Sequence, residues 1–288
     1  MACSWSPVRL GSTALEVVPL GLAAGYGADS SDVERAAERG VNLFYWGSVR
    51  RPAFAEGLRR VAARGRDKVV LVVQTYARWT SGIRGGVEGA LKSLKFDHAD
   101  VLLLGWWNRP PNNAILDAAA EEVRKGRVRA VMISCHHRPT FVELSKDPRV
   151  QLLMLRYNAA HPGAERDVFP HLPSSGSGGS GVVSYTATSW GQLMDPKFTP
   201  PGERTPRGSD CYRFVLSSPH VDATFMGPRS RAELDEAMRA LDLGALGADE
   251  VAWMKRVGER VHAGTKGRNM GIRVIDSLVD LVSGFGAR

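Results

Sequence analysis

The feature that most constrains the fold is an alternation of short apolar runs rich in β-branched residues with longer charged stretches of helical periodicity. Runs such as VVLVVQ and VLLLGW are apolar on both faces, which is typical of parallel strands covered by helices rather than of half-exposed antiparallel strands. The eight strand-like runs are residues 18–23, 41–46, 69–76, 99–105, 128–134, 150–158, 181–185 and 221–227. The helical stretches are residues 31–39, 52–63, 83–94, 113–125, 140–145, 164–171, 210–217 and 231–241.

Eight successive β-α units predict an α/β fold in which the strands close into a (β/α)8 TIM barrel. An N-terminal β-hairpin at about residues 8–17 is expected to plug the bottom of the barrel, and about residues 243–288 form a C-terminal helical extension. The whole chain, residues 1–288, is expected to be a single domain. Apolar residues at amphipathic spacing in residues 265–288 favour packing across the barrel over packing against a partner.

Two loops are expected at opposite ends of this barrel. Residues 173–181, PSSGSGGSG, have almost nothing to pack and predict a flexible surface loop that enters the seventh strand from the bottom. Residues 195–208 follow the seventh strand and therefore belong to the top, where we expect them to cover a ligand.

Composition excludes several classes of protein. With 43% apolar residues, the 288-residue chain can bury a sizeable core, which argues against disorder. No stretch reaches the roughly 18 consecutive apolar residues of a membrane span, so we expect a soluble, cytoplasmic protein without a membrane partner. The 3 cysteines are an odd number without CxxC spacing, and the histidines lack the spacing of metal ligands. We therefore expect reduced thiols and no metal.

The formal charge of +8 raises the possibility of nucleic-acid binding. The basic residues, however, are not gathered into lysine-rich blocks, and many lie on predicted helix faces, such as Arg59 and Arg60. We expect no nucleic-acid partner. Three arginines, Arg78, Arg156 and Arg229, fall at the predicted mouth of the barrel, which favours an anionic small molecule instead.

Several short motifs have an order and spacing that resemble one enzyme family. The opening LGSTALEVVPLGLAAGYG precedes KGRVRA at residues 125–130, Tyr157-Asn158 at the end of the sixth strand, and Tyr185-Thr186-Ala187-Thr188 followed by Gly191 and Leu193. From about residue 10 to residue 241 the chain resembles the aldo-keto reductase superfamily. The resemblance implies a barrel that reduces carbonyl groups with NADPH.

The resemblance fails at the catalytic residues. The family uses an aspartate, a tyrosine, a lysine and a histidine, of which the last two lower the pKa of the tyrosine so that it donates a proton. The corresponding positions here hold Tyr45, Arg50 or a neighbour, Tyr76 and Gly105. The chain is therefore identified as a divergent member that lacks the tetrad, and the family reaction does not follow from the fold alone.

The cofactor segment of the family is better preserved. Gly227-Pro228-Arg229-Ser230, followed by Glu233 and Glu236, resembles the segment that binds the adenosine end of NADPH, and an arginine beside a helix N-terminus suits a phosphate. Tyr185 matches the ring on which nicotinamide stacks. Met154 and Cys135 replace the glutamine and asparagine of the family, so the resemblance supports NADPH in part. The alternative is that Arg229 is a solvated arginine at the start of a helix.

Aromatic and cationic residues follow the predicted strands and should meet at the top of the barrel. The candidate catalytic residues are Tyr45, Tyr76, Arg156, His161 and His136. The two phenols are either proton donors or fillers of the space left by the tetrad; Arg156 and His161 either bind an anion and transfer protons or satisfy their own loop. The candidate substrate-binding residues are Trp46, Trp79, Trp106 and Asn158.

Three functions remain open. The first is an NADPH-dependent reductase of a carbonyl or imine in a small anionic or aromatic substrate. The second is a cofactor-independent acid-base enzyme, such as an isomerase, dehydratase or cyclase. The third is a catalytically inactive ligand-binding barrel. In each case we expect a small-molecule ligand and a monomer or weak homo-oligomer.

Overall fold

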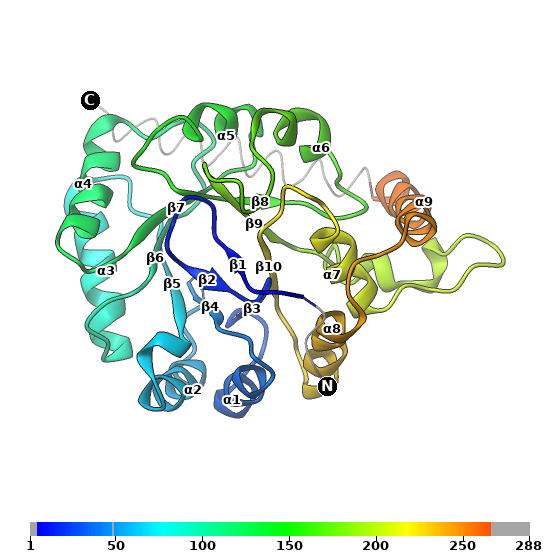
Figure 1. The fold of residues 1–288 in the computed structure, drawn as a ribbon, viewed down its shortest axis with the longest axis horizontal. Coiled ribbons are helices and arrows are strands. Elements are labelled where there is room, and N and C mark those ends of the chain that lie inside the picture. The colour runs from blue at the N-terminus through cyan, green and yellow to red at the C-terminus, as the bar shows by residue number, and fades with distance from the viewer. Residues whose placement is uncertain (1–4, 48, 266–288) are drawn as a thin grey trace.

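The computed structural model describes residues 5–47 and 49–265, and in this part of the chain eight parallel strands close into a barrel (Figure 1). The strand order around it is β10-β3-β4-β5-β6-β7-β8-β9. The strands are β3 (Leu20–Ala23), β4 (Leu43–Trp46), β5 (Val70–Thr75), β6 (Val101–Leu104), β7 (Ala130–Ser134), β8 (Leu152–Arg156), β9 (Gly181–Tyr185) and β10 (Ala223–Met226). The prediction of a (β/α)8 barrel is confirmed, with strands generally shorter than the apolar runs that encode them.

Helices surround the strands, as Figure 1 shows. They are α1 (Ser30–Glu38), α2 (Pro52–Ala63), α3 (Thr80–Leu94), α4 (Asn113–Arg124), α5 (Pro139–Leu144), α6 (Ala164–Asp167), α7 (Gly208–Leu216), α8 (Arg231–Leu243) and α9 (Ala248–Gly264). The predicted helix at 164–171 is wrong in length, because it divides into α6 and a 3-10 turn, η2 (Phe169–His171). Pro170 has no backbone N–H to donate to the carbonyl four residues earlier, so the α-helical hydrogen bonds cannot continue through it.

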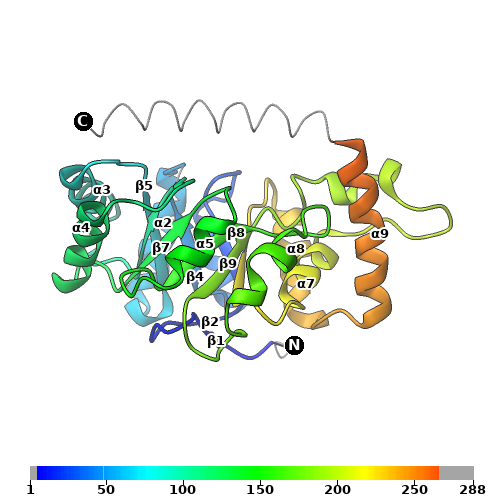
Figure 2. The ribbon, with the colours of Figure 1, turned by 90° about the horizontal axis from the view of Figure 1, so that it is seen from above.

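The predicted hairpin is confirmed as β1 (Val8–Arg9) and β2 (Glu16–Val17), and it lies at one end of the strands (Figure 2). Leu10, Leu15 and Val17 are buried against the inward-facing residues of the barrel. Gly11 lies so close to β9 that a Cβ atom on it would come within 2.1 Å of the Gly181 nitrogen. The loop at 173–181 contacts this hairpin, since the Ser12 N–H donates a hydrogen bond to the Gly179 carbonyl at 2.7 Å.

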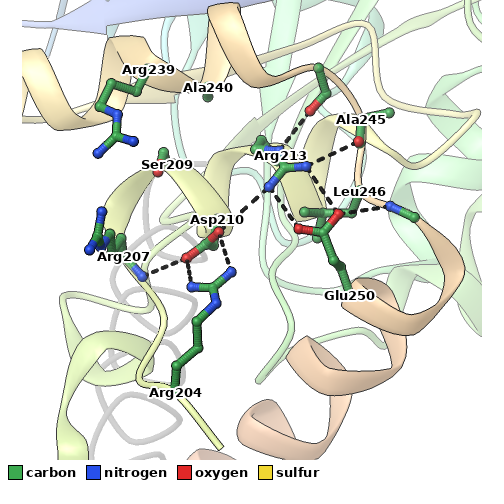
Figure 3. Close-up of polar contacts among 12 residues, drawn as sticks. Arg204, Arg207, Ser209, Asp210, Arg213, Arg239, Ala240, Ala245, Leu246 and Glu250 are labelled. Carbon is green, nitrogen blue, oxygen red and sulfur yellow. Dashed lines mark hydrogen bonds and ion pairs between the residues drawn. The ribbon is translucent and has the colours of Figure 1, made fainter.

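The C-terminal extension is helical in its described part, α9, which packs on the loop after β8. The segment 195–208 does not cover the cavity described below: of its residues only Gly208 lines it. Instead this segment, which contains the 3-10 turn η4 (Pro196–Phe198), contacts α9, where the Arg204 guanidinium stacks on Trp253 at 4.0 Å. Arg204 also forms two hydrogen bonds to the buried Asp210 at the start of α7 (Figure 3).

The amphipathic segment expected to pack across the barrel lies outside the described residues from position 266 onward. Among the helices of the described chain, none is long and apolar enough to span a membrane.

Candidate functional site

A cavity of about 800 Å³ opens at the C-terminal ends of the strands. Its floor is made by inward-facing side chains from six strands: Ala23, Tyr45, Gln74, Leu103, Met154 and Phe225. From this central chamber the cavity extends past the end of β9 to the loop between β10 and α8. The alternation of side chains along each strand places these residues inside the barrel, while their neighbours pack against the helices.

Tyr45 and Gln74 form the polar centre of the floor. The Tyr45 hydroxyl donates a hydrogen bond to Gln74 Oε1, and the Tyr45 ring packs on Phe225 with 5.3 Å between ring centroids. A Cβ atom on Gly105 would lie 2.3 Å from Gln74 Nε2, so the glycine makes the room that this amide occupies. Gln74 is thus the β5 residue whose side chain contacts Tyr45, while Tyr76, which directly follows β5, also lines the cavity.

Arg50 lies behind this pair. Its Nη2 atom donates to the backbone carbonyl of Gln74 at 2.9 Å, and its guanidinium lies 5.3 Å from the ring centre of Trp46. Burial lowers the pKa of Arg50, while the charge of the Tyr45 phenolate raises it. Trp46 itself is buried between barrel and helices and does not line the cavity, so its predicted role in substrate binding is not supported by its position.

Three rings form one wall of the cavity: Tyr76, Trp106 and His136, which we call the aromatic wall. The Tyr76 and Trp106 ring centroids are 6.3 Å apart, and Trp106 meets His136 edge-on at 5.5 Å. The indole nitrogen of Trp106 donates to His136 Nε2 at 3.0 Å. Tyr76 is 50% exposed and Trp106 is 37% exposed, so this wall presents ring surface to whatever enters the cavity.

Arg78 does not line the cavity, but it bonds the backbone of the residues that form the aromatic wall. Its guanidinium donates to the carbonyl oxygens of Tyr76, Gly105 and Trp106 at 2.9, 2.9 and 2.6 Å and stacks on Trp107 at 4.1 Å. The expectation that Arg78 faces an anion at the mouth is not supported by this position, because three of its hydrogen bonds go to backbone carbonyls. Trp79 is 62% exposed, precedes α3 and also lies outside the cavity lining.

Arg156, the last residue of β8, lines the cavity, whereas Asn158 and His161 do not. Asn158 is fully buried: its Oδ1 atom accepts from the backbone N–H groups of Ala160 and His161, and its Nδ2 atom donates to the Thr186 carbonyl. His161 packs against His262 of α9, with ring centroids 5.9 Å apart. Both side chains belong to the loop after β8 and lie outside the cavity lining, so their predicted roles at the reaction centre are not supported by their positions.

The second part of the cavity, which we call the groove, is lined by most of the predicted cofactor-binding residues: Tyr185, Gly227, Arg229, Glu233 and Glu236. Ser230 is the exception, because its hydroxyl caps α8 by accepting from the Glu233 N–H at 3.2 Å. The Glu233 carboxylate accepts from the Arg229 backbone N–H at 2.8 Å. Glu236 accepts from the Ser209 hydroxyl at 2.6 Å and thereby links α8 to α7.

The cavity side chains that sequence reasoning missed include Gln74, Tyr26, Trp190 and Tyr212. Gln74 carried a signal, since it is the one polar residue within the VVLVVQ run. Trp190 lies in the turn after β9, where Thr186, Ser189 and Trp190 all adopt positive φ values of 58°, 50° and 55°. Left-handed backbone at non-glycine residues is costly and concentrates at functional sites.

Comparison with known proteins identifies the fold. No protein-family model matches the chain. Among solved structures, it is similar to the apo form of the aldo-keto reductase AKR11C1 from Bacillus halodurans, with a TM-score of 0.71, 17% sequence identity, and coverage of 88% of this chain and 95% of that one. The holo form of the same enzyme gives a TM-score of 0.72 at 17% identity, covering 88% and 96%. The chain therefore has the fold of an aldo-keto reductase structure.

Proposed function

We propose that this chain is a divergent member of the aldo-keto reductase superfamily that binds NADPH and reduces a carbonyl or imine group, with the Tyr45 hydroxyl as proton donor. One observation carries the proposal: a single cavity connects the Tyr45 hydroxyl on the barrel floor with the groove beside α8. An elongated cofactor lying in the groove would thus reach the same chamber as a substrate.

The donor groups of the groove fit the phosphate end of NADPH. Among the described residues, no carboxylate pairs with the Arg229 guanidinium, which leaves it available for a phosphate at the start of α8. Tyr185 offers a ring at the junction between groove and chamber. At the other end Met154 lines the chamber and offers no amide partner for a carboxamide, so the adenosine end supplies most of the binding.

The residues of the chamber suit the proton-transfer half of a reduction. NADPH, when bound, supplies a hydride to the substrate carbon. Tyr45 would give its hydroxyl proton to the substrate oxygen or nitrogen as negative charge develops there. Gln74 orients that hydroxyl through its hydrogen bond, and the apolar side chains of Leu103, Met154 and Phe225 limit the water around it.

The substrate proposed for this chamber is a small molecule with an aromatic body and an anionic group. The aromatic wall offers exposed ring surface for stacking. Arg156 is the one guanidinium among the described residues that line the chamber rather than the groove, and its planar donors suit a carboxylate. An acid-bearing aromatic aldehyde or ketone satisfies both requirements.

Titration of the purified protein with NADPH, followed by nicotinamide fluorescence, tests the proposal. We expect saturable binding that is tighter for NADPH than for NADH, because only NADPH carries the 2′-phosphate. Arg229→Met should weaken NADPH binding by about tenfold or more, the cost of one charge-assisted contact. Arg124→Met, on the exposed face of α4, is the matched control and should bind as wild type. Absence of binding at millimolar NADPH contradicts the proposal.

A second candidate is cofactor-independent acid-base chemistry, favoured by the presence of His136 and Arg156 in the same chamber as Tyr45. Arg156 would bind an anionic substrate, and His136 or Tyr45 would move the proton. Arg156→Ala or His136→Ala should then abolish turnover without NADPH while the fold is retained. Activity that persists in both variants rules this candidate out.

The proposal takes the protein to act in the cytoplasm, as a single domain and as a monomer or weak homo-oligomer. Absence of a nucleic-acid partner is supported by the pairing of its surface arginines: Arg59 and Arg60 bond Glu56, and Arg64 bonds Glu34. Size-exclusion chromatography with light scattering tests the oligomeric state.

A further inference from the structure

We infer that Gln74 is a catalytic residue: its Nε2 atom donates a hydrogen bond to the carbonyl oxygen of the substrate and stabilises the negative charge that forms there. The inference rests on the proposed function and extends it, because it assigns polarisation of the carbonyl group to a side chain other than the proton donor, Tyr45.

The amide of Gln74 is fixed on the floor of the chamber. Gln74 lies in β5 and is only 6% exposed, yet it lines the cavity. Its Oε1 atom accepts the hydrogen of the Tyr45 hydroxyl, and a Cβ atom on Gly105 would lie 2.3 Å from its Nε2 atom. These two contacts direct Oε1 toward the phenol and place Nε2 beside the backbone of Gly105.

The Nε2 atom has donor capacity that the protein does not use. A primary amide carries two N–H donors on this atom. Within residues 5–47 and 49–265 the side chain of Gln74 bonds only through Oε1, so no acceptor there pairs with Nε2. Nε2 is also absent from the sealed, unpartnered polar atoms of these residues, which means that part of its surface is open to the cavity. Because the side chain is more than nine-tenths buried, an acceptor that enters the cavity meets these donors with little competition from water.

The hydrogen bond from Tyr45 makes Nε2 a stronger donor. The nitrogen and oxygen of an amide are conjugated, so a donor on the oxygen withdraws electron density from the nitrogen. Hydrogen bonds joined in a chain strengthen one another by about 10–30%. The phenol, the amide and the substrate oxygen form such a chain, and the polarity of the Tyr45 hydroxyl therefore acts on the substrate through Gln74.

The composition of the floor directs a carbonyl group to this atom. Among the floor side chains only Tyr45 and Gln74 carry hydrogen-bond donors, and Oε1 engages the donor of Tyr45. A carbonyl oxygen at the floor thus meets Nε2 first. The aromatic wall and Arg156 line the same chamber, where they suit the ring and the carboxylate of an aromatic keto acid.

The amide and the phenol act in sequence during the reduction. Nε2 bonds the carbonyl oxygen of the bound substrate. As the carbon gains a hydride, the second C–O bond breaks and its electron pair stays on the oxygen, where the bond from Nε2 strengthens. The Tyr45 hydroxyl then turns from Oε1 to this oxygen and gives it a proton, which solvent replaces. Gln74 keeps both of its amide hydrogens throughout.

The test is the infrared spectrum of a bound ketone, which needs neither cofactor nor turnover. The probe is 4-acetylbenzoate, an aromatic ketone with a carboxylate, and a carbon-13 label at the ketone separates its band from those of the protein. We expect the bound ketone to absorb at lower frequency than in an apolar solvent, because a hydrogen bond to the oxygen weakens the C=O bond. Gln74→Met should abolish this shift, whereas Tyr45→Phe should retain most of it, because Nε2 remains.

Two further variants complete the experiment. Gln74→Leu is a second side chain without donors, for use if Gln74→Met does not fold. Gln151→Met is the matched control, because it removes an amide that directly precedes β8, at the opposite end of the barrel, and bonds the Pro148 carbonyl. It should bind the ketone and shift its band as wild type does.

Three results overturn the inference. They are an unshifted band in wild type, a shift that survives in Gln74→Met or Gln74→Leu, and failure of 4-acetylbenzoate to bind at millimolar concentration. A shift that is lost in Tyr45→Phe but kept in Gln74→Met assigns the donor to the phenol instead.

NADPH binding and turnover are measured separately. A shifted ketone band without NADPH binding removes the proposed function and leaves the role of Gln74, whereas NADPH binding without the shift does the reverse. In a turnover assay, Gln74→Met should lower kcat by about 100-fold or more, the loss typical of one donor to a developing oxyanion, with little change in KM.

Discussion

Replacement of Arg78 by methionine should destabilise the protein and loosen one wall of its cavity. Arg78 joins the ends of two neighbouring strands, because it bonds the carbonyls of Tyr76 after β5 and of Gly105 and Trp106 after β6. Trp106 has a left-handed backbone, with φ of 58°, and the bond from Arg78 to its carbonyl at 2.6 Å holds it there. Methionine has a similar length but none of these donors.

The magnitude follows from these contacts. A hydrogen bond to a charged group contributes about 1.5–3 kcal/mol to stability. Each bond of Arg78 contributes less than this, because two of the three are at the surface, where water competes for the same groups. Stacking on Trp107 at 4.1 Å adds about 0.5–1 kcal/mol. In the variant, Trp106 can leave its left-handed backbone conformation, and this relief offsets about 1–2 kcal/mol of the lost stability. We therefore expect Arg78→Met to lower the free energy of unfolding by about 2–3 kcal/mol.

Urea denaturation followed by far-UV circular dichroism measures this loss, and Arg124→Met on α4 is the control for removal of a surface arginine. The same variant should weaken binding of an aromatic carboxylate such as 2-naphthoate, because the aromatic wall loses its fixed geometry. Arg78→Lys restores the charge but not the fork of donors, so it should recover only part of the stability. A loss below about 0.5 kcal/mol, equal to that of the control, would refute the role assigned to Arg78.

Two other predictions concern the attachment of the outer helices. Gly258→Ala should lower the free energy of unfolding by about 1–3 kcal/mol, because the added Cβ would lie 2.1 Å from the Ala159 carbonyl oxygen, whereas Gly85→Ala on α3, where nothing lies within 4 Å, should be neutral or stabilising in the same urea experiment. Burial alone would raise the pKa of Asp210, but hydrogen bonds from Arg204 and the Arg207 N–H hold it below its ordinary value (Figure 3). A carboxyl with a depressed folded-state pKa stabilises the fold above its unfolded value of about 3.9 and loses that contribution as the pH falls further. Asp210→Asn should therefore be less stable than wild type at pH 7, and the difference in the free energy of unfolding should shrink near pH 3. The control Asp235→Asn, at an exposed carboxylate, should change little at either pH. An equal loss of stability at both pH values would contradict the depressed pKa of Asp210.

The barrel was predictable because each of its strands carries its own local signal. The runs around Val72, Leu103 and Val131 are apolar on both faces, and such runs are stable only when covered on both sides. Tyr45, Arg156 and Arg229 were also predictable as cavity residues, since residues at the carboxyl ends of barrel strands share one face.

The residues that lie outside the cavity lining share a cause in loop geometry. Arg78, Asn158 and His161 follow strands just as the lining residues do, yet Arg78 and Asn158 bond backbone groups of a neighbouring loop or of their own, and the His161 ring bonds the Asn158 side chain. Trp46 follows the inward-facing Tyr45 by one residue, and the period of two in a strand places it on the opposite face.

The sequence by itself determined the class of fold and the set of residues near the mouth of the barrel, because strand periodicity and chain order are local properties. Only the tertiary structure decided which of those side chains face the cavity. That choice depends on contacts between strand ends far apart in the sequence, such as Arg78 with Trp106 and Tyr45 with Gln74 and Phe225. The cost of leaving a buried carbonyl or amide unpaired fixes the direction of each side chain, and that cost is incurred only once the strands lie side by side.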